Sequence, residues 1–249
     1  MVEMLQLDSR EEWLKHRMKY IGGSDAATIV GQNPWKSNVE LWMEKTGQAI
    51  APDISENPNV KYGTEAEPII RELFKLNYPQ YEVLYAENNS WINDKYPFAA
   101  VSHDGWLIEK ETGRHGIWEC KTSEIVSSMS KEKWKDQIPM NYYCQLLHSL
   151  LVREDCEFAI LTALLTWRYE DKELYQQLRN YHIERSEVQA DILEAVAREE
   201  KTGFDIAVDI GEKTMGTRKT KCEIYRDSMQ NYKKYAIPPR TAYYCGCSV

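Results

Sequence analysis

Residues 115–122 read HGIWECKT, and their alternation of apolar and polar side chains predicts a β-strand. Because residues two apart on a strand point to the same side, Glu119 and Lys121 share one face. The preceding run AAVSHDGW, residues 99–106, is predicted to form a neighbouring strand that places Asp104 across from Glu119. Opposite charges gathered on one face of an otherwise apolar strand require an explanation.

Further strands and helices surround this run. Short apolar stretches bounded by Asn, Asp and Gly predict the strands, and apolar residues recurring every three or four positions predict the helices. Predicted strands cover 81–87, 97–110, 116–122, 157–170 and 181–186, and predicted helices cover 9–21, 24–31, 63–78, 138–152 and 187–202. Residues 33–47 are predicted to form a turn followed by a short helix that ends at Gly47. Strands with helices on both sides in sequence favour an α/β domain with a mixed central sheet and helices packed on it.

Two of the predicted helices have well-marked starts. The chain is expected to break at Gly22–Gly23, after which Ser24 and Asp25, both good N-cap residues, open the second helix. A later helix is expected to begin at Gly63, with Pro68 in its first turn. The apolar face of this later helix is predicted to consist of Ile69, Ile70, Leu73, Phe74 and Leu76.

Charge is distributed unevenly along the 249 residues. The formal net charge is −8, which counts weakly against a polyanionic partner. Residues 213–249 nevertheless carry +6, which leaves −14 for residues 1–212. We therefore expect one domain over 1–212 and a basic tail over 213–249, where Lys and Arg alternate with five tyrosines. That composition suits contacts to a single nucleic-acid strand, and an ordinary solvated tail fits equally well.

The six cysteines show no regular framework, which predicts free thiols. Cys120, for example, is expected to share with Trp118 the strand face opposite Glu119. Cys245 and Cys247 could belong to a metal site, but structural sites need a second such pair or histidine partners, which the sequence does not supply. No apolar run is long enough to span a membrane and the N-terminus is acidic, so we expect a soluble intracellular protein.

Asp104 and Glu119 together suit a divalent cation, because Mg²⁺ prefers carboxylate oxygens along with water and substrate phosphate. Lys121 could orient an attacking water or stabilise a developing anion. A solvated strand face with a Glu–Lys pair would explain the E-x-K triplet alone. Ser102, two residues before Asp104, and Gly105, where a turn or bulge would aim the carboxylate, favour a functional site.

A second polar group lies near the N-terminus. Arg17 precedes by seven residues Ser24, which follows two glycines at a predicted helix start. Free N–H groups at a helix N-terminus, with a hydroxyl and a guanidinium nearby, suit a phosphate. An ordinary N-cap and a surface arginine remain the simpler interpretations of each residue taken alone.

Five motifs occur in a fixed order between about Trp13 and Leu151. They are R-x6-S (Arg17, Ser24), G-T-E-A-E-P (63–68), S-x-D-G (102–105), E-C-K (119–121) and Y-x-x-Q (Tyr142, Gln145). In order and spacing they resemble the phage lambda-type exonucleases and YqaJ-like viral recombinases of the PD-(D/E)XK nuclease superfamily. The resemblance implies a restriction-endonuclease-like α/β core and makes residues 1–212 a single nuclease domain.

The resemblance also assigns roles by position. It implies that Mg²⁺, or Mn²⁺ in its place, is bound by Asp104, Glu119, the backbone carbonyl of Cys120 and Glu67. The residues alone do not choose between Glu65 and Glu67 as the helical ligand. Lys121 and Gln145 would position the attacking water and Tyr142 would support the site. The pocket for the 5′-phosphate of a DNA end would consist of Arg17, Ser24 and Ser102.

The activity implied by the resemblance is digestion of double-stranded DNA ends in the 5′→3′ direction, which leaves 3′ overhangs for phage-type recombination by strand annealing. It further implies a ring-shaped homotrimer, a single-strand annealing protein as partner and the cytoplasm of a bacterial host. Two alternatives stay open. One is a PD-(D/E)XK endonuclease without an end pocket, and the other is a DNA-end-binding module without turnover, which the full set of catalytic side chains argues against.

Overall fold

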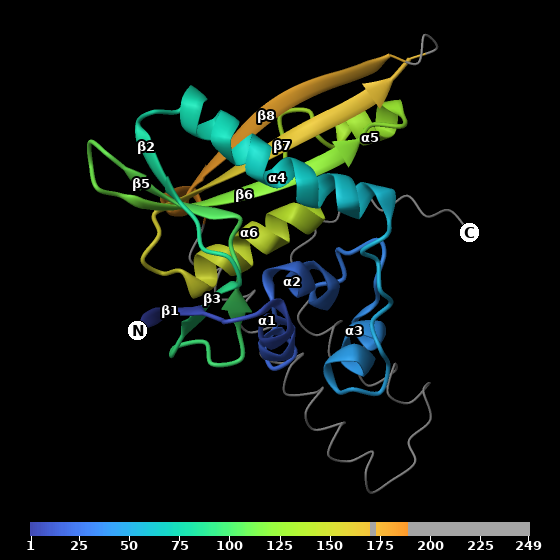
Figure 1. Ribbon diagram of the computed structural model, residues 1–249, viewed down its shortest axis with the longest axis vertical. Coiled ribbons are helices and arrows are strands. Elements are labelled where there is room, and N and C mark those ends of the chain that lie inside the picture. The colour runs from blue at the N-terminus through green and yellow to red at the C-terminus, as the bar shows by residue number, and fades with distance from the viewer. Residues whose placement is uncertain (170–172, 189–249) are drawn as a thin grey trace, which may run out of the picture.

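The computed structural model describes residues 1–169 and 173–188 (Figure 1). The basic tail at 213–249 lies outside the described residues, as do Cys222, Cys245 and Cys247. Almost all of the helix predicted over 187–202 lies outside them too. The described chain ends with a short 3₁₀ helix, η1, at Arg185–Glu187.

A five-stranded mixed sheet forms the centre of the fold. Its strand order is β2-β5-β6-β7-β8, and β6 and β7 are parallel while the other neighbours are antiparallel. A parallel pair needs a crossover, which α6 supplies. The strands are β2 (Tyr81–Leu84), β5 (Gly105–Glu109), β6 (His115–Glu124), β7 (Phe158–Arg168) and β8 (Leu174–Glu184). The predicted α/β architecture is therefore confirmed.

Helices cover both faces of this sheet (Figure 1). Helix α4 (Pro58–Asn77) lies on one face, where Trp118 and Cys120 contact its Ile70 and Phe74. Helix α6 (Met140–Val152) lies on the other face and packs its leucines against alternate residues of β6 and β7. The side-chain alternation predicted for β6 is thus the alternation observed.

A second, three-stranded sheet lies beside the N-terminal helices. It consists of β1 (Val2–Gln6), β3 (Asn89–Asn93) and β4 (Ala100–Val101). Neither β1 nor β3 was predicted, because both are short and depend on pairing with each other rather than on an apolar pattern of their own. The remaining helices are α1 (Arg10–Arg17), α2 (Gly23–Ile29), α3 (Asn38–Lys45) and α5 (Ser128–Glu132).

Two predicted strands are wrong in extent. The strand expected over 97–110 is interrupted, since β4 ends at Val101 and β5 starts at Gly105, so Ser102 and Asp104 lie in an irregular connection. The strand expected over 181–186 is eleven residues long and begins at Leu174. Its first half was missed because the polar sequence LYQQLRN lacks the apolar run of a buried strand.

Helix α4 also differs from its prediction. It begins at Pro58, five residues before Gly63, because the Asn57 side chain accepts a hydrogen bond from the N–H of Asn59 and Pro58 suits the first turn. Pro68 therefore lies inside the helix rather than at its start. Of the five apolar residues predicted to face the core, two are buried (Ile70, Phe74) and three are exposed (Ile69, Leu73, Leu76).

None of the helices within residues 1–169 and 173–188 is both long enough and apolar enough to cross a membrane.

Candidate active site

Asp104 and Glu119 meet where β5 begins beside β6. Gly105 pairs with Trp118 in the antiparallel register, so Asp104 lies opposite the next residue of β6. One carboxylate oxygen of Asp104, Oδ2, accepts a hydrogen bond of 2.8 Å from the backbone N–H of Cys120. This bond fixes the Asp104 carboxylate next to Glu119 despite the interruption of the strand.

Glu119 is buried and has two side-chain partners. Its Oε1 accepts hydrogen bonds of 2.5 Å from Lys121 Nζ and of 2.5 Å from Gln145 Nε2. Its Oε2 is buried without a hydrogen-bond partner among the described residues. Lys121 comes from the same strand face and Gln145 from α6, so the sheet and the helix together place three polar groups around one carboxylate.

The electrostatics of the cluster follow from burial and from crowded negative charge. Burial raises the pKa of Glu119 to about 8, and the neighbouring Asp104 carboxylate adds to this effect. Burial alone would lower the pKa of Lys121, but the carboxylates of Glu119 and Asp104 raise it above its ordinary value. Lys121 is therefore a positively charged donor at neutral pH and cannot serve there as a proton acceptor.

Glu67 approaches the cluster from α4. Burial and then Asp104 raise the pKa of Glu67, while Arg71, one helical turn later, opposes the shift through an ion pair of 2.5 Å. The Arg71 guanidinium in turn stacks 3.6 Å from the ring centre of Tyr85. Glu65 is exposed, so the structure turns Glu67 and not Glu65 toward Asp104.

The donor set fits a hard cation in its chemistry. The pKa values of Glu119 and Glu67 are raised by burial and then by the nearby Asp104 carboxylate, and Oε2 of Glu119 is buried without a hydrogen-bond partner among the described residues, so a divalent ion would stabilise this site. Within the described residues, however, no three His, Cys, Asp or Glu side chains are already close enough to hold one ion. Glu67 forms an ion pair with Arg71 through Oε1.

Cys120 contributes no thiol to this cluster. Its side chain is buried on the α4 face of the sheet, and burial raises its pKa. Only the backbone of Cys120 is available to the site.

The ring of Tyr142 lies next to the Lys121 ammonium. The Lys121 ammonium is 5.7 Å from the centre of the Tyr142 ring, which stacks on Trp134 with 5.5 Å between ring centres. Tyr142 and Gln145 are three residues apart on α6 and therefore share the helix face that meets the cluster.

The residues predicted to bind a phosphate lie at the start of α2. The Arg17 guanidinium, at the end of α1, donates a hydrogen bond to the Ser24 hydroxyl. Ser24 is not the N-cap as predicted, because Gly22 takes that position and the Asp25 carboxylate accepts its N–H at 2.9 Å. The Ser24 hydroxyl is therefore not engaged in capping and faces Arg17 instead.

Ser102 joins this group through a residue that sequence reasoning missed. Trp13 Nε1 donates to the Ser102 hydroxyl at 2.9 Å and to the carbonyl of Asn89 at 3.2 Å. The Arg17 guanidinium lies 5.1 Å from the centre of the same Trp13 ring. The four-residue spacing of Trp13 and Arg17 on one helix was the available signal, since such residues are neighbours on its surface.

Gly23 brings the two groups together. A Cβ at Gly23 would lie 3.2 Å from Cγ of Gln145, so α2 approaches α6 closely here and a larger residue would require the Gln145 side chain to shift. The side chain that donates to Glu119 thus also abuts the residue before Ser24. The carboxylate cluster and the Arg17–Ser24–Ser102 group are adjacent parts of one site.

Residues 12–156, more than half of the chain, match the family model of the YqaJ-like viral recombinase domain. The chain belongs to this family. The match covers all of the motifs that form the site, and it includes Trp13 as well as Lys45.

One curated protein and several solved structures are similar to this chain. The YqaJ protein of Bacillus subtilis (strain 168) is 34% identical over 143 residues, a match that spans 57% of the present chain and 42% of that protein. The alkaline exonuclease LHK-Exo of Laribacter hongkongensis superposes with a TM-score of 0.60 at 17% identity, over 82% of this chain and 96% of that one. A phage-related exonuclease from Haemophilus somnus 129PT gives a TM-score of 0.51 at 13% identity, over 79% and 96%. These structures share the overall fold of the present chain.

Lys45 is a further residue that the motifs of the YqaJ-like family did not reveal. Its ammonium donates to the carbonyls of Arg17 at 2.9 Å and Tyr20 at 2.8 Å, and pairs with the Asp25 carboxylate at 2.8 Å. Lys45 thereby ties α3 to the turn on which Arg17 and Ser24 are mounted. No local pattern could have found this contact, since Lys45 is twenty or more residues away from its partners in sequence.

Proposed function

We propose that this chain is a metal-dependent exonuclease that digests double-stranded DNA from 5′-phosphorylated ends in the 5′→3′ direction and leaves 3′ single-stranded overhangs. One observation carries the proposal. A cluster of carboxylates around the buried Glu119, with a charged lysine, directly adjoins a guanidinium–hydroxyl pair, and Gln145 lies between them. The first group suits phosphodiester hydrolysis and the second suits a terminal phosphate.

Mg²⁺ would be held by Asp104, Glu119, Glu67 and the carbonyl of Cys120, and when bound it supplies an activated water and neutralises charge on the scissile phosphate. Lys121 donates a hydrogen bond from its ammonium to the attacking water or to a phosphate oxygen. Gln145, fixed by Glu119, orients the water through its amide. Tyr142 limits the movement of the Lys121 side chain by covering it.

The end pocket sets the direction of digestion. Arg17, Ser24 and Ser102 bind the 5′-phosphate of the terminal nucleotide, so the next phosphodiester of the same strand meets the carboxylates. Cleavage there releases a 5′-mononucleotide and presents a new 5′-phosphate to the pocket. The complementary strand is left as a 3′ overhang, the substrate for a single-strand annealing protein in phage-type recombination.

The relatives support this proposal by what they are named for. One solved relative is an alkaline exonuclease, another is a phage-related exonuclease, and the family is that of a viral recombinase domain. We further propose a homotrimeric ring that acts in the cytoplasm of a bacterial host of a phage or prophage.

The decisive experiment is digestion of a linear duplex labelled on one strand. Its 5′ ends carry phosphate or hydroxyl, and the buffer contains Mg²⁺ or EDTA. We expect stepwise loss of nucleotides from phosphorylated 5′ ends in Mg²⁺, much slower loss from hydroxyl ends, and no loss in EDTA. Cleavage of circular DNA at a similar rate would refute the end pocket and favour an endonuclease.

Matched variants separate hydrolysis from binding. Lys121→Ala should abolish cleavage and retain DNA-end binding, whereas Lys61→Ala, which removes an exposed lysine of α4, should retain both. A melting-temperature increase on addition of Mg²⁺ reports the metal independently of activity, and Glu119→Gln should reduce it. A wild-type chain that binds ends without any Mg²⁺-dependent product would instead be an end-binding module.

A further inference from the structure

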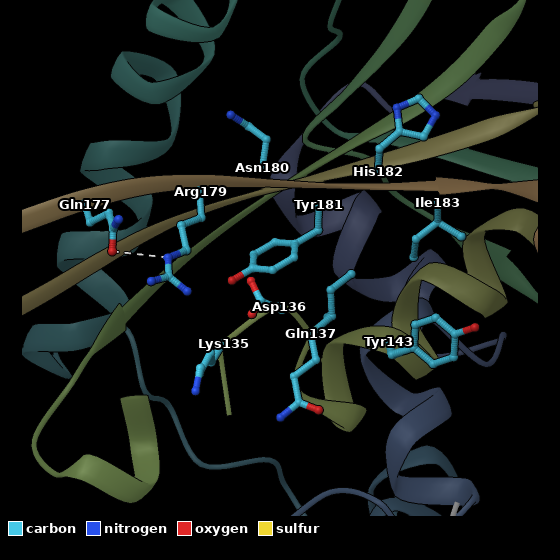
Figure 2. Close-up of a pocket in the computed structure, with 11 residues that line it drawn as sticks. Lys135, Asp136, Gln137, Tyr143, Gln177, Arg179, Asn180, Tyr181, His182 and Ile183 are labelled. Carbon is cyan, nitrogen blue, oxygen red and sulfur yellow. Dashed lines mark hydrogen bonds between the residues drawn. The ribbon is translucent and has the colours of Figure 1, made fainter. Parts of the chain in front are cut away.

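A pocket of about 670 Å³ opens at the β8 edge of the central sheet, outside the site described above (Figure 2). One wall is β8, and the other is the segment 135–138 that leads into α6. Alternate residues of β8 turn their side chains into the pocket, whereas Asn180 and His182 point away from it, as Figure 2 shows. The lining side chains include Gln177, Arg179, Tyr181, Lys135, Asp136 and Tyr143.

Two cations and one carboxylate face this space. Arg179 is held in place because Nη1 donates to the carbonyl of Trp134 at 2.7 Å and Nε donates to Gln177 at 3.1 Å (Figure 2). Lys135 is 64% exposed and lies 3.7 Å from its nearest carboxylate, Glu132, so its ammonium is available to a ligand. Asp136, the one acidic residue of the lining, takes a left-handed backbone conformation with φ of 53°.

The pocket is joined to the carboxylate cluster by a row of aromatic rings. Tyr142, which covers Lys121, stacks on Trp134, and the Trp134 ring centre is 5.9 Å from that of Tyr181 in the pocket. The β8 side chains that point into the pocket lie on the same face of the sheet as Glu119 and α6. The pocket and the carboxylate cluster therefore lie on the same side of the sheet.

Along α6, the pocket and the Arg17–Ser24–Ser102 group lie on opposite sides of the carboxylates. Gln145, toward the middle of the helix, adjoins Gly23 and thereby the Arg17–Ser24–Ser102 group. Tyr142 is one turn nearer the helix N-terminus, and Trp134 comes before the helix begins. A strand with its 5′-phosphate beside Ser24 and its next phosphodiester at Glu119 would therefore continue toward β8.

We propose that this pocket binds the sugar–phosphate backbone of the digested DNA strand on the 3′ side of the cleavage point. The inference rests on the proposed exonuclease function and adds a binding subsite to it. Lys135 and Arg179 contact backbone phosphates, and the amide of Gln177 and the tyrosines contact sugars and bases, the combination that single strands favour. Asp136 repels the same phosphates and moderates the affinity.

The test measures the affinity of the full chain for a 5′-phosphorylated duplex by fluorescence anisotropy in EDTA, over a range of salt concentrations. Lys135→Ala should weaken binding roughly two- to fivefold and lower the slope of log affinity against log salt by about one. Lys133→Ala, which removes an exposed lysine two residues away and outside the pocket, is the matched control and should change neither by as much.

A second variant predicts the opposite sign. Asp136→Asn keeps a residue type that tolerates positive φ and removes the negative charge, so it should tighten binding by a similar factor. A duplex with single neutral methylphosphonate linkages then locates the contact. One linkage 3′ of the cleavage point should weaken binding to the wild type and leave Lys135→Ala unaffected.

Equal affinities and equal salt slopes for Lys135→Ala and Lys133→Ala would overturn the inference, and so would an unchanged affinity of Asp136→Asn. Unchanged DNA affinity in all of these variants is also the result expected if the pocket binds a peptide segment instead of DNA. Failure of the proposed function looks different, because the wild type would then lack either the preference for 5′-phosphorylated ends or digestion in Mg²⁺. If the wild type digests DNA but Lys135→Ala and Lys133→Ala have equal affinities and salt slopes, only the proposed subsite is refuted.

Discussion

Replacing Lys45 by methionine tests how the chain recognises a phosphorylated end. The Lys45 ammonium contacts three acceptors, the carbonyls of Arg17 and Tyr20 and the carboxylate of Asp25. Methionine fills similar space but removes all three donors, so little cavity forms. The Asp25 side chain, only 10% exposed, then retains the Gly22 N–H and draws on the next available cation, Arg17.

The size of the effect follows from these contacts. Removing one partner of a buried ion pair costs about 3–5 kcal/mol, and we expect the lower end because Asp25 keeps its backbone hydrogen bond. Movement of Arg17 toward Asp25 also breaks its charge-assisted hydrogen bond to Ser24. The loss of this bond corresponds to about a tenfold smaller preference for 5′-phosphate over 5′-hydroxyl ends. The rate on 5′-phosphate ends should fall by about that factor, and the rate on 5′-hydroxyl ends should not change.

The assay compares initial rates on the two kinds of end and the free energy of unfolding in urea. Lys36→Met is the control. Lys36 forms its ion pair of 2.6 Å with Glu44 of the same helix, α3, and not with a residue of the Arg17–Ser24–Ser102 group. The reasoning is refuted if Lys45→Met keeps the full preference for phosphorylated ends. It is also refuted if Lys36→Met loses that preference to the same extent.

Three further predictions concern single side chains. Trp13→Phe keeps a ring beneath Arg17 but loses the Nε1 donor to Ser102, so the preference for phosphorylated ends should fall several-fold in the same rate comparison. Cys120→Ala should keep nearly full nuclease activity and lose about 1 kcal/mol of stability in urea unfolding, because its thiol is buried away from the cluster; loss of activity would contradict a purely backbone role. Burial acts to raise the pKa of Asp25, but Lys45 and Arg17 outweigh it and lower that pKa. The stability that Asp25 contributes is therefore complete above about pH 4 and lost as the pH falls through the lowered pKa, so Asp25→Asn should flatten the acid limb of a stability–pH curve.

The part of the site that sequence could predict is the part built from local geometry. Strand alternation put Glu119 and Lys121 on one face and Cys120 on the other, because a period of two is set by the backbone itself. A hairpin between neighbouring strands then brought Asp104 to Glu119, even though the regular strand was interrupted. The contact between Arg17 and Ser24 could also be expected, since the two residues are only seven apart in sequence; their role in binding a phosphate stays a prediction.

Contacts between distant elements could not be predicted in this way. Lys45 meets its partners only after α3 folds against the turn between α1 and α2. On α4 the apolar residues form two stripes, and the sequence does not say which one faces the sheet. The stripe with Ile70 and Phe74 is buried and the one with Ile69 is exposed. The long, polar β8 was recognised only in part because most of its residues contribute hydrogen bonds rather than apolar area.

The contact of Gly23 with Gln145 restricts how relatives of this chain can diverge. A surface loop such as 46–57, between α3 and α4, can gain or lose residues during evolution without altering either half of the site. An insertion between Arg17 and Ser24 would instead push α2 away from α6 and separate end recognition from hydrolysis. We therefore expect descendants of this gene to vary in loop length around a spacing of seven residues that stays constant.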